Sequence, residues 1–138
     1  MCVLIAQKGK KKKKRRYVGE NIFNMKTVST WTSTIYVGRY CIKENKLVPE
    51  LRLRDVCQKY CDENGFCVTF TPTTFIYTKD HEPGAIVGLI HYPRFPADVE
   101  VLETRALELA KRLLKVAKQK RVSVVFPKRT VMLENSDL

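Results

Sequence analysis

The chain has 138 residues, of which 44% are hydrophobic and 29% are charged. This size and composition indicate one soluble globular domain with a single core, and they leave no room for a second. No stretch reaches the roughly 20 apolar residues that a membrane span requires, and the apolar opening from Met1 to Ala6 is too short for a secretory signal and precedes the basic run instead of following it. We therefore expect a cytoplasmic protein without a membrane partner.

The net charge of +12 is concentrated near the N-terminus. Eight of the 26 basic residues lie between Lys8 and Arg16. The rest of the chain has 18 basic and 14 acidic residues, which gives it a net charge of only +4. We predict a disordered basic tail over residues 1–27 and a ligand-binding α/β domain over residues 28–138. The tail is either simply solvated or binds nucleic acid weakly and nonspecifically through its phosphates.

The five cysteines do not form a recognisable framework. Their odd number and the absence of C-x-x-C spacing indicate free thiols in a reducing compartment. Cys57 and Cys61 lie four residues apart in a helical pattern and could approach Cys67, but three thiols without a fourth ligand make a weak zinc site. We expect neither a metal nor a cofactor.

The first half of the domain alternates strand and helix patterns. Thr32 to Arg39 is β-branched and aromatic, which predicts a strand. Apolar residues at helical spacing predict a helix that begins near Pro49 and ends at Gly65 as its C-cap. A second strand is predicted from Phe66 past Pro72 to Tyr77, with a type II turn at Pro83-Gly84 and a return strand from Ala85 to Tyr92.

A long helix is predicted from about Ala97 to Lys120, followed by strands from Arg121 to Phe126 and from Thr130 to Leu133. One face of that helix is apolar and consists of Leu102, Ala106, Leu109, Ala110, Leu113 and Ala117. The order is then β-α-β-β-α-β with a small addition. It predicts an α+β fold in a single domain, with a mainly antiparallel sheet and two helices on one face.

Two of the predicted strands are apolar at nearly consecutive positions, from Ile86 to Ile90 and from Val122 to Phe126. Such strands are typical of sheets covered on both faces, whereas two helices cover only one. We therefore expect the second face to contact a partner, most simply another copy of the chain in a homo-oligomer.

The sequence lacks the Walker loop, G-x-G-x-x-G, H-E-x-x-H and G-x-S-x-G motifs. Its two histidines, His81 and His91, are not part of H-x-S/T pairs. His81 lies in a turn, where it is either solvated or a general base held by a nearby carboxylate. His91 is in phase with the apolar residues of the return strand, so it is either a hydrogen-bonded core or interface histidine or a ring that stacks on a ligand base.

Three arginines are candidates for phosphate binding, because guanidinium groups grip phosphate in pairs of hydrogen bonds. Arg105 and Arg112 lie seven residues apart on one flank of the long helix, and Arg121 opens the strand after it. The alternative is that they are ordinary surface residues.

Five short strings resemble the first family of phage Thoeris anti-defence proteins over roughly residues 32–134. They are Ile35-Tyr-Val-Gly38, Pro72-Thr-Thr-Phe-Ile-Tyr-Thr-Lys79, Glu82-Pro-Gly84, Tyr92-Pro-Arg-Phe-Pro96 and Val122-Ser-Val-Val125. The resemblance implies a non-enzymatic protein that binds cyclic ADP-ribose signals of bacterial TIR proteins, in the cytoplasm of an infected host. It also implies dimer units that assemble into larger oligomers, with the ligand between neighbouring chains and, in some members, cyclic oligonucleotides at separate sites.

The resemblance also assigns roles to residues of this chain. It places His81 and His91 where relatives contact the base or ribose, although an aromatic and an amide are expected there. Arg121 and Arg105 correspond to the arginines that bind the pyrophosphate, and Phe75 is expected to add a ring to the pocket.

The sequence thus predicts a sponge that holds a cyclic ADP-ribose isomer or another cyclic nucleotide without converting it. Two alternatives stay open at this point. One is a phosphodiesterase or glycohydrolase that uses His81 and His91, and the other is a nucleic-acid-binding protein that acts through its basic tail.

Overall fold

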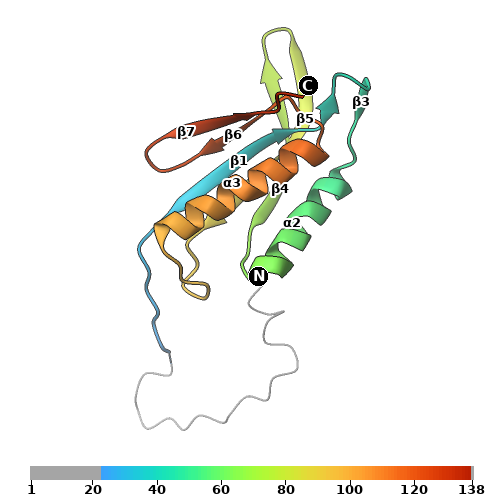
Figure 1. Ribbon diagram of the computed structural model, residues 1–138. Helices are drawn as coiled ribbons and strands as arrows, with labels where there is room; N and C mark the ends of the chain where they lie inside the picture. Colours follow the sequence, from blue (N-terminus) through green and yellow to red (C-terminus); the bar gives the residue numbers. More distant parts are fainter. Residues whose placement is uncertain (1–22, 138) are drawn as a thin grey trace.

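The computed structural model describes residues 23–137, so the basic run from Lys8 to Arg16 lies outside the described part. The domain has two layers, a five-stranded sheet and two helices on one of its faces (Figure 1). The strand order is β4-β5-β1-β6-β7, and every neighbouring pair is antiparallel. The predicted α+β class and element order are confirmed.

The elements of the main sheet are β1 (Thr32–Gly38), β4 (Thr69–Tyr77), β5 (Asp80–Ile90), β6 (Arg121–Val125) and β7 (Thr130–Glu134). The helices are α2 (Glu50–Asn64) and α3 (Val99–Val116). A small hairpin of β2 (Tyr40–Cys41) and β3 (Lys46–Leu47) connects β1 to α2. The sequence did not predict this hairpin, because strands of two residues carry no measurable alternation.

Helix α2 follows the pattern that predicted it. It begins after Pro49, buries Leu53, Cys57 and Tyr60 against the core, and ends at Gly65. Gly65 has a φ of 66° and its N–H donates to Cys61 O at 2.8 Å. A left-handed residue at a helix C-terminus favours glycine, so this end is encoded locally.

The predicted turn at Pro83-Gly84 is wrong. Both residues lie inside β5, and the chain reverses at Thr78 and Lys79 instead. The carbonyl of Pro83 accepts a hydrogen bond from Arg39 N–H at 3.0 Å. The N–H and C=O of a strand residue point to the same side, so the N–H that proline lacks would also point toward the end of β1 and away from β4. A proline there removes no ladder bond to β4, which explains why the strand tolerates it.

Gly84 is required by packing and not by a turn. A Cβ at this position would lie 2.4 Å from Phe75 Cε2 and 2.4 Å from Val37 O. The Phe75 ring therefore crosses β5 at Gly84, and it meets Tyr36 edge-on at a centroid distance of 6.4 Å. The part of β5 before Gly84, from Asp80 to Pro83, pairs with β4 but not with β1. This end of the β4–β5 hairpin is a two-stranded arm that projects from the sheet in Figure 1.

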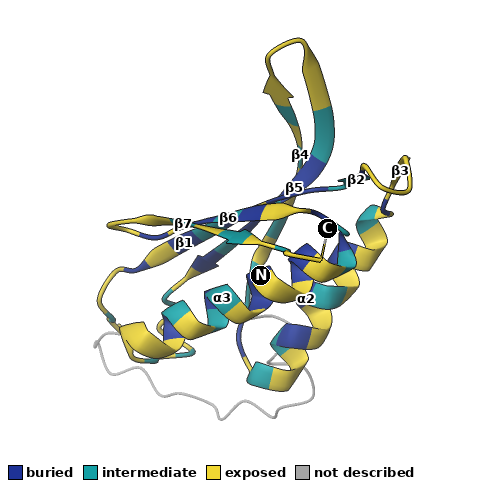
Figure 2. Ribbon diagram, turned by 45° about the horizontal axis from the view of Figure 1, so that its top comes forward, coloured by how far each residue is buried: buried dark blue, intermediate teal, exposed yellow. Residues whose placement is uncertain are grey.

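Helix α3 is shorter than predicted because it ends at Val116 and the chain turns sharply at Lys118. Its predicted apolar face is confirmed, since Leu102, Ala106, Leu109, Ala110, Leu113 and Ala117 are all buried. They pack with Ile35, Val37, Ala85, Val87, Val122 and Val124 from the sheet to form one core (Figure 2). None of the helices in residues 23–137 is long and apolar enough to cross a membrane.

The opposite face of the sheet has no helix over it. Strand register places Tyr36, Ile86 and Ser123 on this face, with Met132 beyond Ser123. The large apolar residues exposed there include Tyr36, Ile90, Val125 and Met132. The expected uncovered apolar face is therefore present in the single chain.

The cysteines of the described part differ in whether they form a disulfide bond. Cys41, Cys57 and Cys61 are free, as predicted, whereas Cys67 is disulfide-bonded, contrary to the prediction. Burial raises the pKa of the Cys57 thiol to about 12, which makes it an unreactive core residue. Among residues 23–137, no three His, Cys, Asp or Glu side chains are arranged to hold a metal ion.

Candidate ligand-binding cleft

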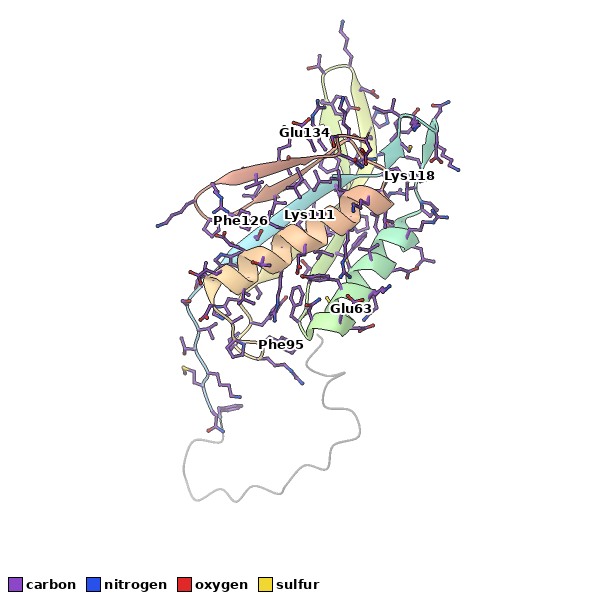
Figure 3. The ribbon with its side chains drawn as sticks, viewed as in Figure 1. Glu63, Phe95, Lys111, Lys118, Phe126 and Glu134 are labelled. Atoms are coloured by element: carbon purple, nitrogen blue, oxygen red, sulfur yellow. The ribbon has the colours of Figure 1, made fainter. Side chains whose placement is uncertain are left out.

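A cleft of about 600 Å³ lies at one end of the sheet, which is a common size for small-molecule sites. It is formed by the β2–β3 hairpin, the start of β5 and the connection from α3 to β6, with Asp137 near the C-terminus at its edge. Its principal polar residues are Tyr40, Lys43, Glu82, Lys118, Gln119 and Arg121. Figure 3 shows Lys118 at the end of α3 and Glu134 of β7 at the same end of the molecule.

The connection from α3 to β6 places three cations along one wall. Lys118 takes a left-handed conformation with a φ of 53°, which ends the helix. Gln119 then points inward and is buried, while Lys120 and Arg121 lead into β6. A helix end and a strand start thus bring Lys118, Lys120 and Arg121 to one cleft.

The floor of the cleft offers oxygen acceptors. A Cβ on Gly38 would lie 2.7 Å from Glu82 Oε2 and 2.8 Å from Gln119 Oε1, so both oxygens occupy the space that the missing side chain leaves. The Gln119 amide donates to Tyr40 O at 2.8 Å and to Ala117 O at 3.1 Å, which fixes its oxygen toward Gly38. Two acceptors side by side suit a ligand with hydroxyl or amine donors.

The rim of the cleft is cationic. Lys43, Lys118, Lys120 and Arg121 outnumber the two carboxylates that line it, Glu82 and Asp137. Arg121 Nε lies 3.4 Å from Glu134 Oε2, and Lys118 pairs with Glu44. Lys43 and Lys120 form no ion pair within residues 23–137. Unpaired and weakly paired cations around a concave surface attract anions.

Two of the five residues predicted for the site lie at or beside this cleft. Arg121 lines it directly. Phe75 pairs with Glu82 across β4 and β5, so its ring lies next to a cleft residue on the uncovered face of the sheet. Their ligand contacts remain a prediction.

The two histidines lie at opposite ends of β5. His81 is exposed on the projecting arm, and it points away from the face that carries Glu82 because neighbouring strand residues alternate. His91 follows the last residue of β5, ten residues further along. At about 3.3 Å per residue, the two side chains are roughly 30 Å apart. They do not form one catalytic pair within a chain.

Both nitrogens of His91 already have partners. Nδ1 donates to Ser29 O at 2.8 Å, and Nε2 accepts a hydrogen bond from Ala97 N–H at 3.2 Å. The carbonyl of Ser29 can only accept, which assigns the proton to Nδ1. His91 therefore ties the segment before β1 to the loop before α3.

Arg105 is not near Arg121. Its guanidinium lies over the Phe66 ring at 5.2 Å, in a shallower groove of about 350 Å³ beside the end of α2. Arg112 behaves similarly, over the Tyr60 ring at 4.7 Å and 2.7 Å from Glu63 Oε1. The three candidate arginines are therefore divided between the helix layer and the cleft.

The sequence did not identify Lys43, Glu82, Lys118 and Gln119 as site residues. The run Lys118-Gln-Lys-Arg121 between a helix and a strand carried a usable signal, since three cations fall within four positions. The close approach of Gly38 to Glu82 had no signal in the sequence, because it depends on where β1 ends relative to β5.

No protein-family model matches the chain, and no curated protein is similar enough in sequence to count as a match. Solved structures with a similar fold include a phage SAM lyase in complex with S-methyl-5'-thioadenosine, with a TM-score of 0.66 and 15% identity over 83% of this chain and 97% of that chain. The same kind of protein in its apo state gives a TM-score of 0.57 and 16% identity over 77% and 90%. At such low identity the similarity shows the fold alone.

Proposed function

We propose that the chain binds an anionic nucleotide in the cleft beside Arg121 and holds it without turnover. The ligand class is a cyclic ADP-ribose isomer or a related cyclic nucleotide, and the biological effect is inhibition of TIR-based defence in the cytoplasm of an infected bacterium. The observation that carries the proposal is the cleft itself, which joins a cationic rim to a floor of two acceptor oxygens.

This arrangement matches the two chemical halves of such a ligand. Ribose hydroxyls would donate to Glu82 and Gln119, while the pyrophosphate would face Lys120 and Arg121. Charge-assisted hydrogen bonds contribute about 1.5–3 kcal/mol each, and nanomolar affinity requires about 12 kcal/mol. Two phosphate contacts and one stacked base, at about 1–3 kcal/mol, reach at most about 9 kcal/mol, so the ribose contacts to Glu82 and Gln119 must contribute as well.

The fold gives independent support for a nucleoside in this architecture, because a structurally similar phage SAM lyase was solved with S-methyl-5'-thioadenosine. That ligand contains adenosine but no phosphate. The cationic rim of the present cleft favours a ligand that keeps the nucleoside and adds negative charge.

A second copy of the chain is the proposed partner of the uncovered sheet face. Tyr36 and Met132 are exposed on that face, and Phe75 extends it toward Glu82. A symmetric dimer would bury these side chains and place the aromatic ring of one or both copies near the cleft. Analytical ultracentrifugation of the full chain tests this assembly, and a monomer at micromolar concentration would contradict it.

An enzyme is the second candidate, because Glu82 is a half-buried carboxylate in the cleft and the structurally similar proteins are named as lyases. Incubation with cyclic ADP-ribose, followed by denaturation and chromatography, separates the two functions. A sponge returns the ligand intact in an amount no greater than the protein. Product in excess over protein would establish turnover instead.

The affinity itself is tested by calorimetry against cyclic ADP-ribose isomers, cyclic di- and trinucleotides, S-methyl-5'-thioadenosine and S-adenosylmethionine. We expect the phosphate-bearing ligands to bind more tightly than the two others. Deletion of residues 1–24 tests the nucleic-acid alternative, since it should abolish nonspecific DNA binding and leave small-ligand affinity unchanged.

A further inference from the structure

Lys118 occupies a position where glycine would be more stable. It follows Ala117 at the end of α3 and has a φ of 53°, in the left-handed region that L-residues other than glycine adopt at a cost. The preceding helix, α2, ends in the same conformation with Gly65. Asn45 and Lys79 adopt the same conformation in hairpin turns, and Lys118 differs from them in that its side chain lines the cleft.

The side chain of Lys118 forms an ion pair with Glu44, which belongs to the turn between β2 and β3, 74 residues away in the sequence. Glu44 also lies 3.2 Å from Lys46 Nζ. Both lysines hold the pKa of Glu44 below its ordinary value, with the hydrogen bond from Lys118 as the larger cause. The carboxylate is therefore charged at neutral pH and ties the β2–β3 hairpin to the cleft wall.

We propose that Lys118 is an anion-binding residue of the cleft and that Glu44 is an internal competitor for it, which a phosphate group of the ligand displaces. This inference rests on the proposed nucleotide site. An exposed ion pair is weak, so a ligand anion can replace it at small cost. Release of Glu44 also frees the turn between β2 and β3, which carries the cleft residue Lys43, while Tyr40 of β2 stays bonded to Gln119.

The probe is inorganic pyrophosphate, titrated by calorimetry into the full-length chain and its variants. Glu44→Gln removes the competitor and keeps the size of the side chain. We expect it to bind pyrophosphate roughly two- to fivefold more tightly, as the loss of a surface ion pair predicts. Glu50→Gln is the matched control, because Glu50 pairs with Arg54 on the surface of α2 and its loss changes the net charge equally. Its affinity should equal that of the wild type.

Lys118→Gly provides the second readout. It should weaken pyrophosphate binding roughly tenfold and leave the melting temperature unchanged or raise it, since glycine relieves the left-handed backbone. A lower melting temperature with unchanged affinity would show that Lys118 has a structural role and would overturn the inference.

The outcomes separate this inference from the proposed function. If Arg121→Ala weakens binding while Glu44→Gln and Lys118→Gly bind like the wild type, the competitor mechanism is wrong and the cleft remains the site. If the wild-type chain shows no saturable binding of pyrophosphate at millimolar concentration, both proposals fail.

Discussion

The two ends of β5 use their polar groups in opposite ways. At the far end, His91 has both ring nitrogens bonded to the backbone, and its own N–H donates to Trp31 O at 2.9 Å. At the cleft end, the oxygens of Glu82 and Gln119 crowd the space beside Gly38, and Lys120 has no ion pair within the described residues.

The difference supports a structural role for the His91 end and the proposed ligand site at the cleft end. Polar groups that already have protein partners stabilise the fold and have little left to offer a ligand. At the cleft end the contacts are longer or missing: Tyr40 N–H donates to Glu82 Oε2 at 3.4 Å, Arg121 Nε lies 3.4 Å from Glu134 Oε2, and Lys43 and Lys120 form no ion pair within residues 23–137. Weakly paired groups on a concave surface are available to an incoming molecule. The comparison therefore favours Arg121 as a ligand residue and assigns His91 a structural role.

The largest expected effect belongs to Arg121→Ala. It should lower the affinity for cyclic ADP-ribose more than tenfold, because it removes a charge-assisted donor worth about 1.5–3 kcal/mol. Stability should change little, since the Arg121–Glu134 pair is exposed. Arg129→Ala is the control, because it removes the same charge at the far turn of β6 and β7, where Arg129 pairs with Glu103 through two hydrogen bonds. Equal affinity losses in both variants would contradict a local site.

His91→Ala tests the other end of the strand. The variant loses two hydrogen bonds to the backbone and should be destabilised by about 1–2 kcal/mol in urea unfolding. Ligand affinity should remain unchanged in calorimetry. A variant with wild-type stability and lost binding would reverse the roles assigned to the two ends.

Gly38→Ala disturbs the cleft floor and not the core. The added Cβ would lie 2.7 Å from Glu82 Oε2 and 2.8 Å from Gln119 Oε1, so the Glu82 side chain must move and the Gln119 amide, which two hydrogen bonds hold in place, must shift slightly. We expect a loss of stability of about 1 kcal/mol, at the lower end of the range for overpacking, and roughly threefold weaker nucleotide binding. Gly84→Ala is the contrasting variant, because its Cβ meets the backbone oxygen of Val37 and should cost about 1–3 kcal/mol of stability.

The smallest effect concerns pH. Because Lys118 and Lys46 lower the pKa of Glu44 from 4.5, the carboxylate stabilises the folded chain above that pH and loses this contribution as the pH falls through its folded pKa. Wild type should thus be slightly more stable than Glu44→Gln at neutral pH, and the difference should vanish in acid. Thermal melts across the acidic range measure it, and a difference that grows in acid would contradict the ion pair.

Much of the fold could be read from local patterns. The apolar spacing of Leu102 and Leu109 predicted α3, and Gly65 predicted the end of α2. The turn at Pro83-Gly84 was misplaced because those residues serve packing across strands, a relation between Phe75 and Gly84 that local sequence does not encode. The cleft was only partly predictable for the same reason. Arg121 had a signal of its own, but Glu82 and Gln119 meet only in the folded chain.

The most direct test of the cleft as the ligand site is an NMR titration of isotope-labelled protein with a cyclic ADP-ribose isomer, followed through backbone amide shifts. We expect saturable changes at Tyr40, Gln119 and Arg121, with His91 and Arg105 unaffected. Changes confined to His91 or Arg105, or no saturable change at any residue, would show that the cleft is not the ligand site.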